Sequence, residues 1–215
     1  MGMERTVVIS CAGMGNRLGL HTTKALIDVD GKTLIRRHLE MLEDEKDVRV
    51  VVGYQAESVI EEVRKYREDV TFVYNYDYAT TKTGDSVVLA AKGAKEYLLS
   101  LDGDLLIHPE DMKKILECDH EFVSGGDIES DEPWMVQTVT GEGTELANGF
   151  SKESGAYEWN GITQIKSQKI LNGTGHVFQL VEPFLPVPFL EIRTREIDTM
   201  NDYERAVAWV KNGFC

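Results

Sequence analysis

The first hundred residues alternate between apolar runs and amphipathic segments, and this alternation is the strongest constraint on the fold. The apolar runs have the length of buried strands and lie at residues 7–9, 48–52, 70–74 and 97–101. The amphipathic segments carry apolar residues at helical spacing and lie at 33–45, 56–67 and 86–95. Strands joined by helices of this length pair in parallel through crossovers. We therefore expect an α/β fold with a mostly parallel sheet and crossover helices.

The first apolar run, Val7-Val8-Ile9, leads into a glycine-rich loop, Cys11-Ala12-Gly13-Met14-Gly15-Asn16-Arg17-Leu18-Gly19. Its three glycines leave backbone N–H groups uncovered, and a turning chain can present them to phosphate oxygens. Arg17 and Lys24 add positive charge beside the loop. A tight turn also explains a Gly-x-Gly pair, but the two cations favour a triphosphate site. The dinucleotide fingerprint is excluded because its third glycine would fall at Leu18.

Two further polar sites follow from where the expected strands and helices begin and end. The strand at 97–101 runs into Asp102-Gly103-Asp104, so two carboxylates leave the sheet edge where ligands bind in open α/β folds. Carboxylates suit Mg²⁺, and the alternative is a turn with solvated acids. The polar loop 75–85 leads into the helix expected from Ser86. Asp85 or Ser86 is therefore either a plain helix cap or part of a ligand site at spare N–H groups.

The second half of the chain departs from the alternation. A helix is expected at 109–118 and a strand at 122–126, followed by antiparallel strands at 134–139 and 144–152. We expect these last two strands to belong to a small insertion over the sheet, at about 127–165. The proline-punctuated stretch 177–190 is expected to be irregular, and 201–212 to form the last helix. Without a linker or an internal repeat, residues 1–215 are expected to make a single domain.

Net charge restricts the partners. The chain has 37 acidic and 23 basic residues and a formal net charge of −14, which argues against nucleic acid or an anionic membrane, since both need a basic face. A triphosphate site is compatible with this charge if basic residues cluster locally and a divalent cation joins them. Three cysteines without paired spacing indicate reduced thiols. No signal peptide or transmembrane run is visible, so we expect a cytoplasmic protein; no sequence feature indicates an oligomeric state.

The glycine loop and the residues after it resemble the signature of the nucleotidyltransferases that activate sugar phosphates and phosphocholine, G-x-G-x-R-L followed by P-K-x-L and G-K-P-L. The corresponding segments are Gly13-x-Gly15-x-Arg17-Leu18, Thr23-Lys24-Ala25-Leu26 and Gly31-Lys32-Thr33-Leu34. The chain departs from the pattern with Ser10-Cys11 before the loop, and with Thr23 and Thr33 in place of proline. The resemblance covers nearly the whole chain and implies a three-layer, Rossmann-like fold.

The resemblance also implies a reaction and roles for single residues. An acceptor phosphate attacks the α-phosphorus of a nucleoside triphosphate, and pyrophosphate leaves. Asp104 and Asp198 would bind Mg²⁺, Arg17 would neutralise the pyrophosphate, and Lys24 would neutralise the α-phosphate and the acceptor. As a residue of an exposed loop, Lys24 is expected to matter for turnover and little for stability. The residues expected around the nucleotide are Ala12, Gly13, Met14, Gly15, Asn16, Gly53, Asp85, Ser86 and Asp102.

The acceptor site is expected in the second half of the chain. By resemblance, Lys152 would hold the acceptor phosphate and Gly161 would lie beside the acceptor. Trp134 and Trp159 with nearby acids can form a pocket for a cationic amine such as choline, although core packing explains these aromatic residues equally well. The chain length and the Glu132-Pro133-Trp134 neighbourhood most resemble phosphocholine cytidylyltransferases, so CTP and a phosphocholine-like acceptor are expected. The alternatives are a sugar phosphate, polyol phosphate or phosphonate with another triphosphate, and a nucleotide-binding regulatory module without turnover.

Overall fold

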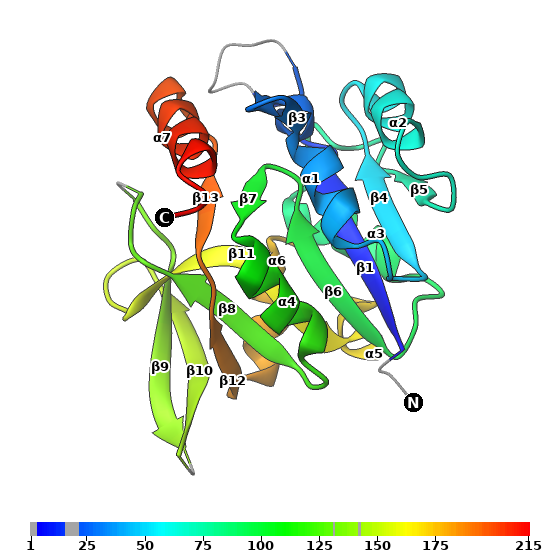
Figure 1. Ribbon diagram of the computed structural model, residues 1–215. Coiled ribbons are helices and arrows are strands. Elements are labelled where there is room, and N and C mark those ends of the chain that lie inside the picture. Colours follow the sequence, from blue (N-terminus) through cyan, green and yellow to red (C-terminus); the bar gives the residue numbers. More distant parts are fainter. Residues whose placement is uncertain (1–3, 16–21, 131, 142) are drawn as a thin grey trace.

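A nine-stranded sheet forms the centre of the computed structural model, which describes residues 4–15, 22–130, 132–141 and 143–215 (Figure 1). The strand order is β5-β4-β1-β6-β11-β8-β12-β10-β9. Their bounds are β1 Arg5–Cys11, β4 Val48–Val52, β5 Thr71–Tyr74, β6 Tyr97–Asp102, β8 Phe122–Gly126, β9 Met135–Gly141, β10 Thr144–Ser151, β11 Tyr157–Lys166 and β12 Val187–Glu191. Strands β10 and β11 run opposite to the others. The sheet is therefore mostly parallel, as predicted.

Helices cover both faces of this sheet and complete three layers (Figure 1). On one face, α1 (Leu34–Met41), α2 (Ala56–Arg64) and α4 (Pro109–Glu117) pack on apolar side chains of β1, β4 and β6. On the other face lie α3 (Thr83–Ala91), α5 (Ser167–Ile170) and α6 (Val177–Val181). The last helix, α7 (Met200–Lys211), packs beside the small ladder of β2 (Asp28–Val29) and β3 (Lys32–Thr33). Within the described ranges, no helix has the length and apolar character needed to cross a membrane.

Strand β1 shows why the middle of the sheet is a continuous apolar run in the sequence. Val7 and Ile9 point into the core under α1, α2 and α4, while Val8 points into the opposite core. All three side chains are fully buried, and each burial contributes about 1.5–3 kcal/mol. Because β1 lies between β4 and β6, its carboxyl end opens at the middle of the sheet edge, where the glycine loop begins.

The predicted antiparallel strands are present, but they extend the sheet and do not lie over it. Strands β9 and β10 pair with each other, β10 joins β12, and β9 returns to β11. The strands β11, β8, β12, β10 and β9 therefore close on themselves at this end. The alternation of residues specifies which face of a strand is apolar, but it does not specify the neighbouring strands.

Two stretches of the second half differ from the prediction. Residues 157–166, expected only as part of the insertion, form β11 between β6 and β8. Residues 177–190, expected to be irregular, contain α6, a 3-10 helix at Glu182–Phe184 and most of β12. Pro183 stands in the first turn of the 3-10 helix, and Pro188, the register partner of Leu146 in β10, stands just before the residues of β12 that pair with β8. At such positions a missing N–H group is tolerated.

A second ladder joins distant parts of the chain at the edge of the large sheet. Strand β7 (Leu105–Ile107) follows β6 directly, and it pairs with β13 (Thr194–Glu196) in antiparallel register. Glu196 is the partner of Leu105 in this ladder. Because Leu105 is next to Asp104 in the chain, the ladder carries Glu196 to the carboxylates that follow β6.

Candidate active site

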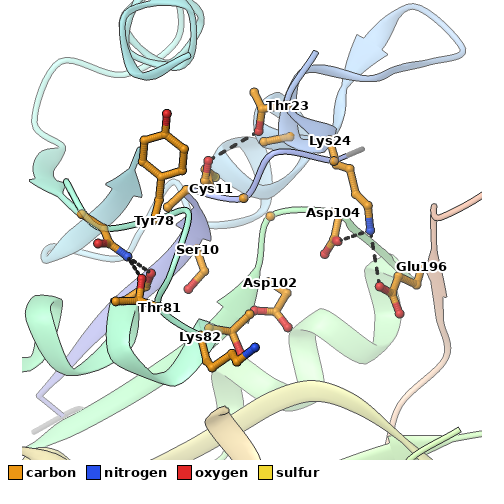
Figure 2. Close-up of a pocket in the computed structure, with 18 residues that line it drawn as sticks. Ser10, Cys11, Thr23, Lys24, Tyr78, Thr81, Lys82, Asp102, Asp104 and Glu196 are labelled. Atoms are coloured by element: carbon orange, nitrogen blue, oxygen red, sulfur yellow. Dashed lines mark hydrogen bonds and ion pairs between the residues drawn. The ribbon is translucent and has the colours of Figure 1, made fainter. Parts of the chain in front are cut away.

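A cavity of about 370 Å³ opens at the carboxyl ends of β1 and β6. Its walls are the glycine loop, the segment around Lys24, the loop before α3 and the turn after β6 (Figure 2). The lining residues are Ser10, Cys11, Ala12, Gly13, Gly15, Thr23, Lys24, Ala25, Asn75, Tyr78, Thr81, Lys82, Thr83, Ser86, Asp102, Gly103, Asp104 and Glu196. The cavity thus collects predicted residues from four separate segments, at the sheet edge where open α/β folds bind ligands.

The glycine loop lies against the side chain of Lys24. A Cβ atom on Gly15 would lie 3.0 Å from Lys24 Cγ, and the φ angle of Gly15 is +59°. Both observations favour glycine at this position, because a side chain would press on the lysine stem. Thr23 ties the next segment to β1 by donating its hydroxyl to the carbonyl oxygen of Cys11 at 3.4 Å. This bond is visible at the top of the cavity in Figure 2.

Three carboxylates, which we call the acid triad, meet at one end of the cavity. Asp104 follows β6, whereas Glu196 and Asp198 come from the region of β13. One oxygen of each residue lies within 4.8 Å of the others. In the described part of the chain, this is the one group of three or more His, Cys, Asp or Glu residues placed to hold a metal ion. The fold therefore brings Asp104 and Asp198 together, as expected, and adds Glu196.

The ammonium group of Lys24 lies among the oxygens of the acid triad, and Figure 2 shows it against Asp104 and Glu196. Nζ is 2.8 Å from Asp104 Oδ2 and 3.5 Å from Glu196 Oε1, and it also contacts Asp198 Oδ1. The side chain of Lys24 is 12% exposed, so the expectation of an exposed loop lysine is wrong. Burial alone would lower its pKa, but the three carboxylates outweigh burial and raise the pKa of Lys24.

The donor set of the acid triad fits a hard divalent cation. Mg²⁺ binds one or two carboxylates and completes its shell with water and substrate phosphate. The triad offers carboxylate oxygens and neither imidazole nor thiolate. The neighbouring thiol of Cys11 does not add a soft ligand: burial, and then the charges of Asp104 and Asp102, raise the pKa of Cys11 and keep it protonated.

Asp102 and Ser10 present unpaired polar atoms beside the triad. The two residues are register partners in β6 and β1, and both line the cavity. Asp102 Oδ1 and Ser10 Oγ are buried without a hydrogen-bond partner among the described residues. Burial, followed by the charges of Asp104 and Glu196, raises the pKa of Asp102 well above its usual range. Because buried polar atoms are nearly always paired, these two atoms can pair with a polar group that enters the cavity.

The loop before α3 forms another wall of the cavity, and Asn75 organises it. Asn75 is buried, and its Nδ2 donates to Thr81 Oγ1 at 2.8 Å and to Ser86 Oγ at 3.0 Å. Its Oδ1 accepts a hydrogen bond from the N–H group of Asp77 at 3.0 Å. One side chain therefore holds both ends of the loop. Ser86, a predicted nucleotide residue, is buried at the cavity wall as a result.

Asp85 caps helix α3 and does not line the cavity. Helix α3 begins at Thr83, three residues before its expected start, so Asp85 lies inside the first turn. Its carboxylate accepts hydrogen bonds from the N–H groups of Lys82 at 2.7 Å and Gly175 at 3.0 Å. Thr174 Oγ1 also donates to it at 2.6 Å. Of the two readings left open for Asp85, the geometry favours the helix cap.

The remaining predicted nucleotide residues lie around the cavity or outside the described residues. Gly53 lies behind the wall, where a Cβ atom would be 2.8 Å from Tyr78 Cβ and 3.0 Å from Ala12 Cβ. Met14 is 36% exposed and does not line the cavity. Asn16 and Arg17 fall in the segment 16–21, outside the described residues.

Most of the predicted acceptor residues belong to an aromatic cluster that does not line the cavity. The ring centroids of Trp134 and Phe178 are 4.4 Å apart, and Lys152 Nζ lies 5.4 Å from the centroid of Trp134. Trp159 packs edge-on against Phe150 with centroids 5.1 Å apart. The protein thus supplies both the ring and the cation at Trp134, which favours the packing explanation over a pocket for choline. Of the four predicted acceptor residues, Gly161 also does not line the cavity, but it lies against Asp102, which does.

Sequence reasoning missed Glu196, although a signal for it exists. Glu196 stands two residues before Asp198 in an extended segment, and residues at this spacing point to the same side of the chain. The lining residues Tyr78, Thr81 and Lys82 carry no comparable signal. Their positions depend on the path of the loop before α3, which the hydrogen bonds of Asn75 determine.

Residues 7–128 match the family described as the MobA-like NTP transferase domain. Among curated proteins, the chain is 36% identical over 107 residues to the bifunctional protein GlmU of Bifidobacterium adolescentis, covering 49% of this chain and 23% of that protein. It is 29% identical over 113 residues to the bifunctional protein GlmU of Aliarcobacter butzleri, covering 52% and 26%. The matches therefore span about a quarter of the length of these relatives.

Solved structures share the fold over nearly the whole chain. A CTP:phosphocholine cytidylyltransferase (LicC) from Streptococcus pneumoniae has a TM-score of 0.75 at 21% identity, covering 96% of this chain and 99% of that chain. A putative glucose-1-phosphate thymidylyltransferase from Bacillus anthracis has a TM-score of 0.76 at 15% identity, covering 96% and 95%. A UDP-glucose pyrophosphorylase has a TM-score of 0.72 at 14% identity, covering 98% and 100%. At these identities the likeness shows the fold alone.

Proposed function

This chain belongs to the MobA-like NTP transferase family, and we propose that it transfers CMP from CTP to a small acceptor. Solved structures that share its fold are described as nucleotidyltransferases, which supports the proposal. The acceptor supplies a phosphate or phosphonate oxygen, and pyrophosphate is released. One observation carries this proposal: a single cavity joins a glycine loop, Lys24, Asp104 and Glu196, and Asp198 lies beside these two carboxylates. The glycine loop can bind phosphate oxygens, the lysine can neutralise their charge, and the carboxylates can hold a metal ion. Nucleotidyl transfer needs these three functions together.

The residues of the cavity suggest how the transfer proceeds. The N–H groups of the glycine loop can bind phosphate oxygens, and the stem of Lys24 lies against Gly15 of that loop. An anionic oxygen of the acceptor attacks the α-phosphorus, and the bond from that phosphorus to the bridging oxygen of the β-phosphate breaks. The pyrophosphate carries away the electron pair. Because the attacking oxygen is already ionised, positioning and charge neutralisation account for catalysis without a general base.

The acid triad is the proposed site for Mg²⁺. Asp104, Asp198 and Glu196 would hold the ion through carboxylate oxygens. Bound there, Mg²⁺ would neutralise charge on the α-phosphate and orient it for in-line attack. Arg17, which lies outside the described residues, keeps its proposed role of neutralising the pyrophosphate by resemblance alone.

The preference for CTP rests on the small, polar surroundings of Ser86. Asn75 holds the Ser86 hydroxyl at the cavity wall, and Ala12 lines the cavity close by. Gly53 stands behind this wall, where neighbouring atoms leave no room for a side chain. A narrow site with short polar groups suits a pyrimidine, and unpaired partners penalise other bases. The likeness to the phosphocholine cytidylyltransferases supports cytosine.

Transfer to a sugar phosphate is the second candidate. Lys152 lies over Trp134, which places a positive charge where a choline group would need an open ring face. This arrangement disfavours a quaternary amine at Trp134 and is neutral towards a sugar. Two of the structural neighbours are also described by sugar-phosphate activities. A nucleotide-binding regulatory module is disfavoured, because Lys24, Asp104 and Asp198, which nucleotidyl transfer would use, stand together in the structure.

A pyrophosphate-release assay tests these proposals. CTP, UTP, ATP and GTP are each supplied with Mg²⁺ and one acceptor from phosphocholine, 2-aminoethylphosphonate, glycerol 3-phosphate, glucose 1-phosphate and N-acetylglucosamine 1-phosphate. The Asp104→Asn variant serves as the control for contaminating activity. Fastest release with CTP and phosphocholine supports the first proposal, and fastest release with a sugar phosphate supports the second. Nucleotide binding without release in any combination would establish the regulatory module.

A further inference from the structure

We propose that Lys24 is the internal counter-ion of the acid triad in the metal-free protein, and that a divalent cation must expel the Lys24 ammonium to bind there. The inference rests on the proposed Mg²⁺ site and adds a device that regulates it. Lys24 and the metal would occupy the triad in turn and never together. The lysine that handles substrate phosphate would therefore become available only after the metal has bound.

The first support is geometric. Lys24 Nζ lies within 3.5 Å of an oxygen from each member of the triad, so the ammonium fills the space between the same oxygens that would coordinate a metal. A magnesium ion needs its ligand oxygens at about 2.0–2.1 Å. Two cations cannot share that space, because both would be in contact with the same three oxygens.

The second support is electrostatic. The carboxylates of the triad lie within 4.8 Å of one another, so their negative charges repel each other. Asp104 and Asp198 are mostly buried and Glu196 is exposed, and solvent screens the repulsion between the two buried carboxylates only in part. The ammonium therefore stabilises the triad without a metal and opposes the arrival of one.

The path of the lysine side chain supports the exchange. Its stem passes Gly15 in the glycine loop, where a Cβ atom would be 3.0 Å from Lys24 Cγ. Figure 2 shows the side chain reaching from that side of the cavity down to Asp104 and Glu196. A stem that starts beside the glycine loop keeps the expelled ammonium within the cavity, close to the N–H groups proposed to bind phosphate. Metal binding and phosphate binding are thereby coupled through one side chain.

Binding of Mn²⁺ without nucleotide tests the inference directly. The Lys24→Met variant removes the ammonium and keeps a side chain of similar length. The Lys65→Met variant is the matched control, because Lys65 also pairs with a carboxylate, Glu62 at 2.8 Å, but at an exposed surface away from the triad. Mn²⁺ affinity is measured by electron paramagnetic resonance of the free ion. We expect Lys24→Met to bind Mn²⁺ at least about tenfold more tightly than the parent protein, and Lys65→Met to match the parent.

A second measurement follows the accessibility of Lys24 in the parent protein. It therefore does not depend on whether a variant folds. Reductive methylation with isotopic formaldehyde, read peptide by peptide by mass spectrometry, reports the accessibility of each lysine. In EDTA we expect Lys24 to react slowly. Addition of Mn²⁺ should increase its labelling several-fold and leave Lys65 unchanged.

Equal or weaker Mn²⁺ binding by Lys24→Met, or labelling of Lys24 that Mn²⁺ does not increase, would overturn the inference. The same holds if neither protein binds Mn²⁺ at millimolar concentration. None of these results affects the transferase proposal, which depends on the pyrophosphate-release assay. Conversely, the outcome could be that Lys24→Met binds Mn²⁺ tightly while the parent protein releases no pyrophosphate. That result would support the counter-ion role of Lys24 and contradict the transferase proposal.

Discussion

The carboxylate of Asp102 occupies the place that a side chain on Gly161 would need. A Cβ atom on Gly161 would lie 2.5 Å from Asp102 Oδ2, and the φ angle of Gly161 is +82°. The pairing of β11 with β8 shifts register between Trp159 and Thr163, which marks a bulge around this glycine. The bulge therefore makes room at the cavity wall for a carboxylate from the neighbouring strand β6.

Replacement of Gly161 with alanine should damage both stability and the site. The added methyl group collides with Asp102, and overpacking of this kind costs about 1–3 kcal/mol. The backbone strain of a positive φ adds to this cost. Gly31→Ala is the matched control, because Gly31 has the same φ of +82° and nothing within 4 Å of its Cβ position. Urea unfolding should show a larger loss for Gly161→Ala than for Gly31→Ala. Equal losses would mean that Asp102 does not constrain this position.

The acid triad should be essential for turnover and dispensable for folding. Asp104→Asn and Asp198→Asn each remove one negative charge from the proposed metal site, and we expect kcat to fall by about 100-fold or more. The exposed Asp119 provides a control, since Asp119→Asn should leave kcat unchanged. Circular dichroism checks that each variant is folded. A folded Asp104→Asn protein with near-normal turnover would remove Asp104 from the metal site.

Asn75 should act on nucleotide affinity through the loop that it holds. Asn75→Ala removes hydrogen bonds to Thr81, Ser86 and Asp77, each worth about 1 kcal/mol. We expect a stability loss of roughly 2–3 kcal/mol and a raised KM for the triphosphate with a smaller change in kcat. Steady-state kinetics with the acceptor held at saturation separate the two constants. A KM that does not change would show that the loop before α3 does not contact the nucleotide.

Asp111 should make the stability of the protein depend on acid pH. Its carboxylate is buried in α4 and binds Arg193 Nε at 2.7 Å and Lys114 Nζ at 2.6 Å. Burial alone would raise the pKa of Asp111, but the bonds from Arg193 and Lys114 outweigh burial and hold the pKa well below its usual range. A carboxyl with a lowered folded pKa contributes stability above its unfolded pKa of about 3.9, and this contribution is lost as the pH falls further.

The Asp111→Asn variant isolates this contribution. At pH 7 we expect it to be less stable than the parent by roughly 2 kcal/mol, the cost of weakening a buried, charge-assisted hydrogen-bond group. The difference should shrink as the pH falls below about 4, because Asp111 of the unfolded parent then takes up a proton that the folded protein does not bind. Denaturant unfolding at several pH values measures it. A difference that stays constant from pH 7 to pH 3 would show that the charge of Asp111 is not what stabilises the fold.

The sequence alone determined the elements near the centre of the fold and the start of the site. The apolar run of β4 ends where the structure ends it, at Val52. Asp102 and Asp104 emerge after a strand, and the glycine loop follows β1, both at the cavity. These features are local: a strand, a helix face and a turn each depend on residues a few positions apart, which a periodic pattern records.

Tertiary structure alone decided which distant residues meet. Lys24 and Asp198 are 174 positions apart, and they touch because β13 pairs with β7 beside the end of β6. The same kind of long-range placement inserts β11 between β6 and β8, where Gly161 faces Asp102. It also packs Lys152 over Trp134. Both residues were predicted to bind the acceptor, but neither lines the cavity. Strand order follows from how the whole chain buries its apolar faces, and no pattern of neighbouring residues contains that information.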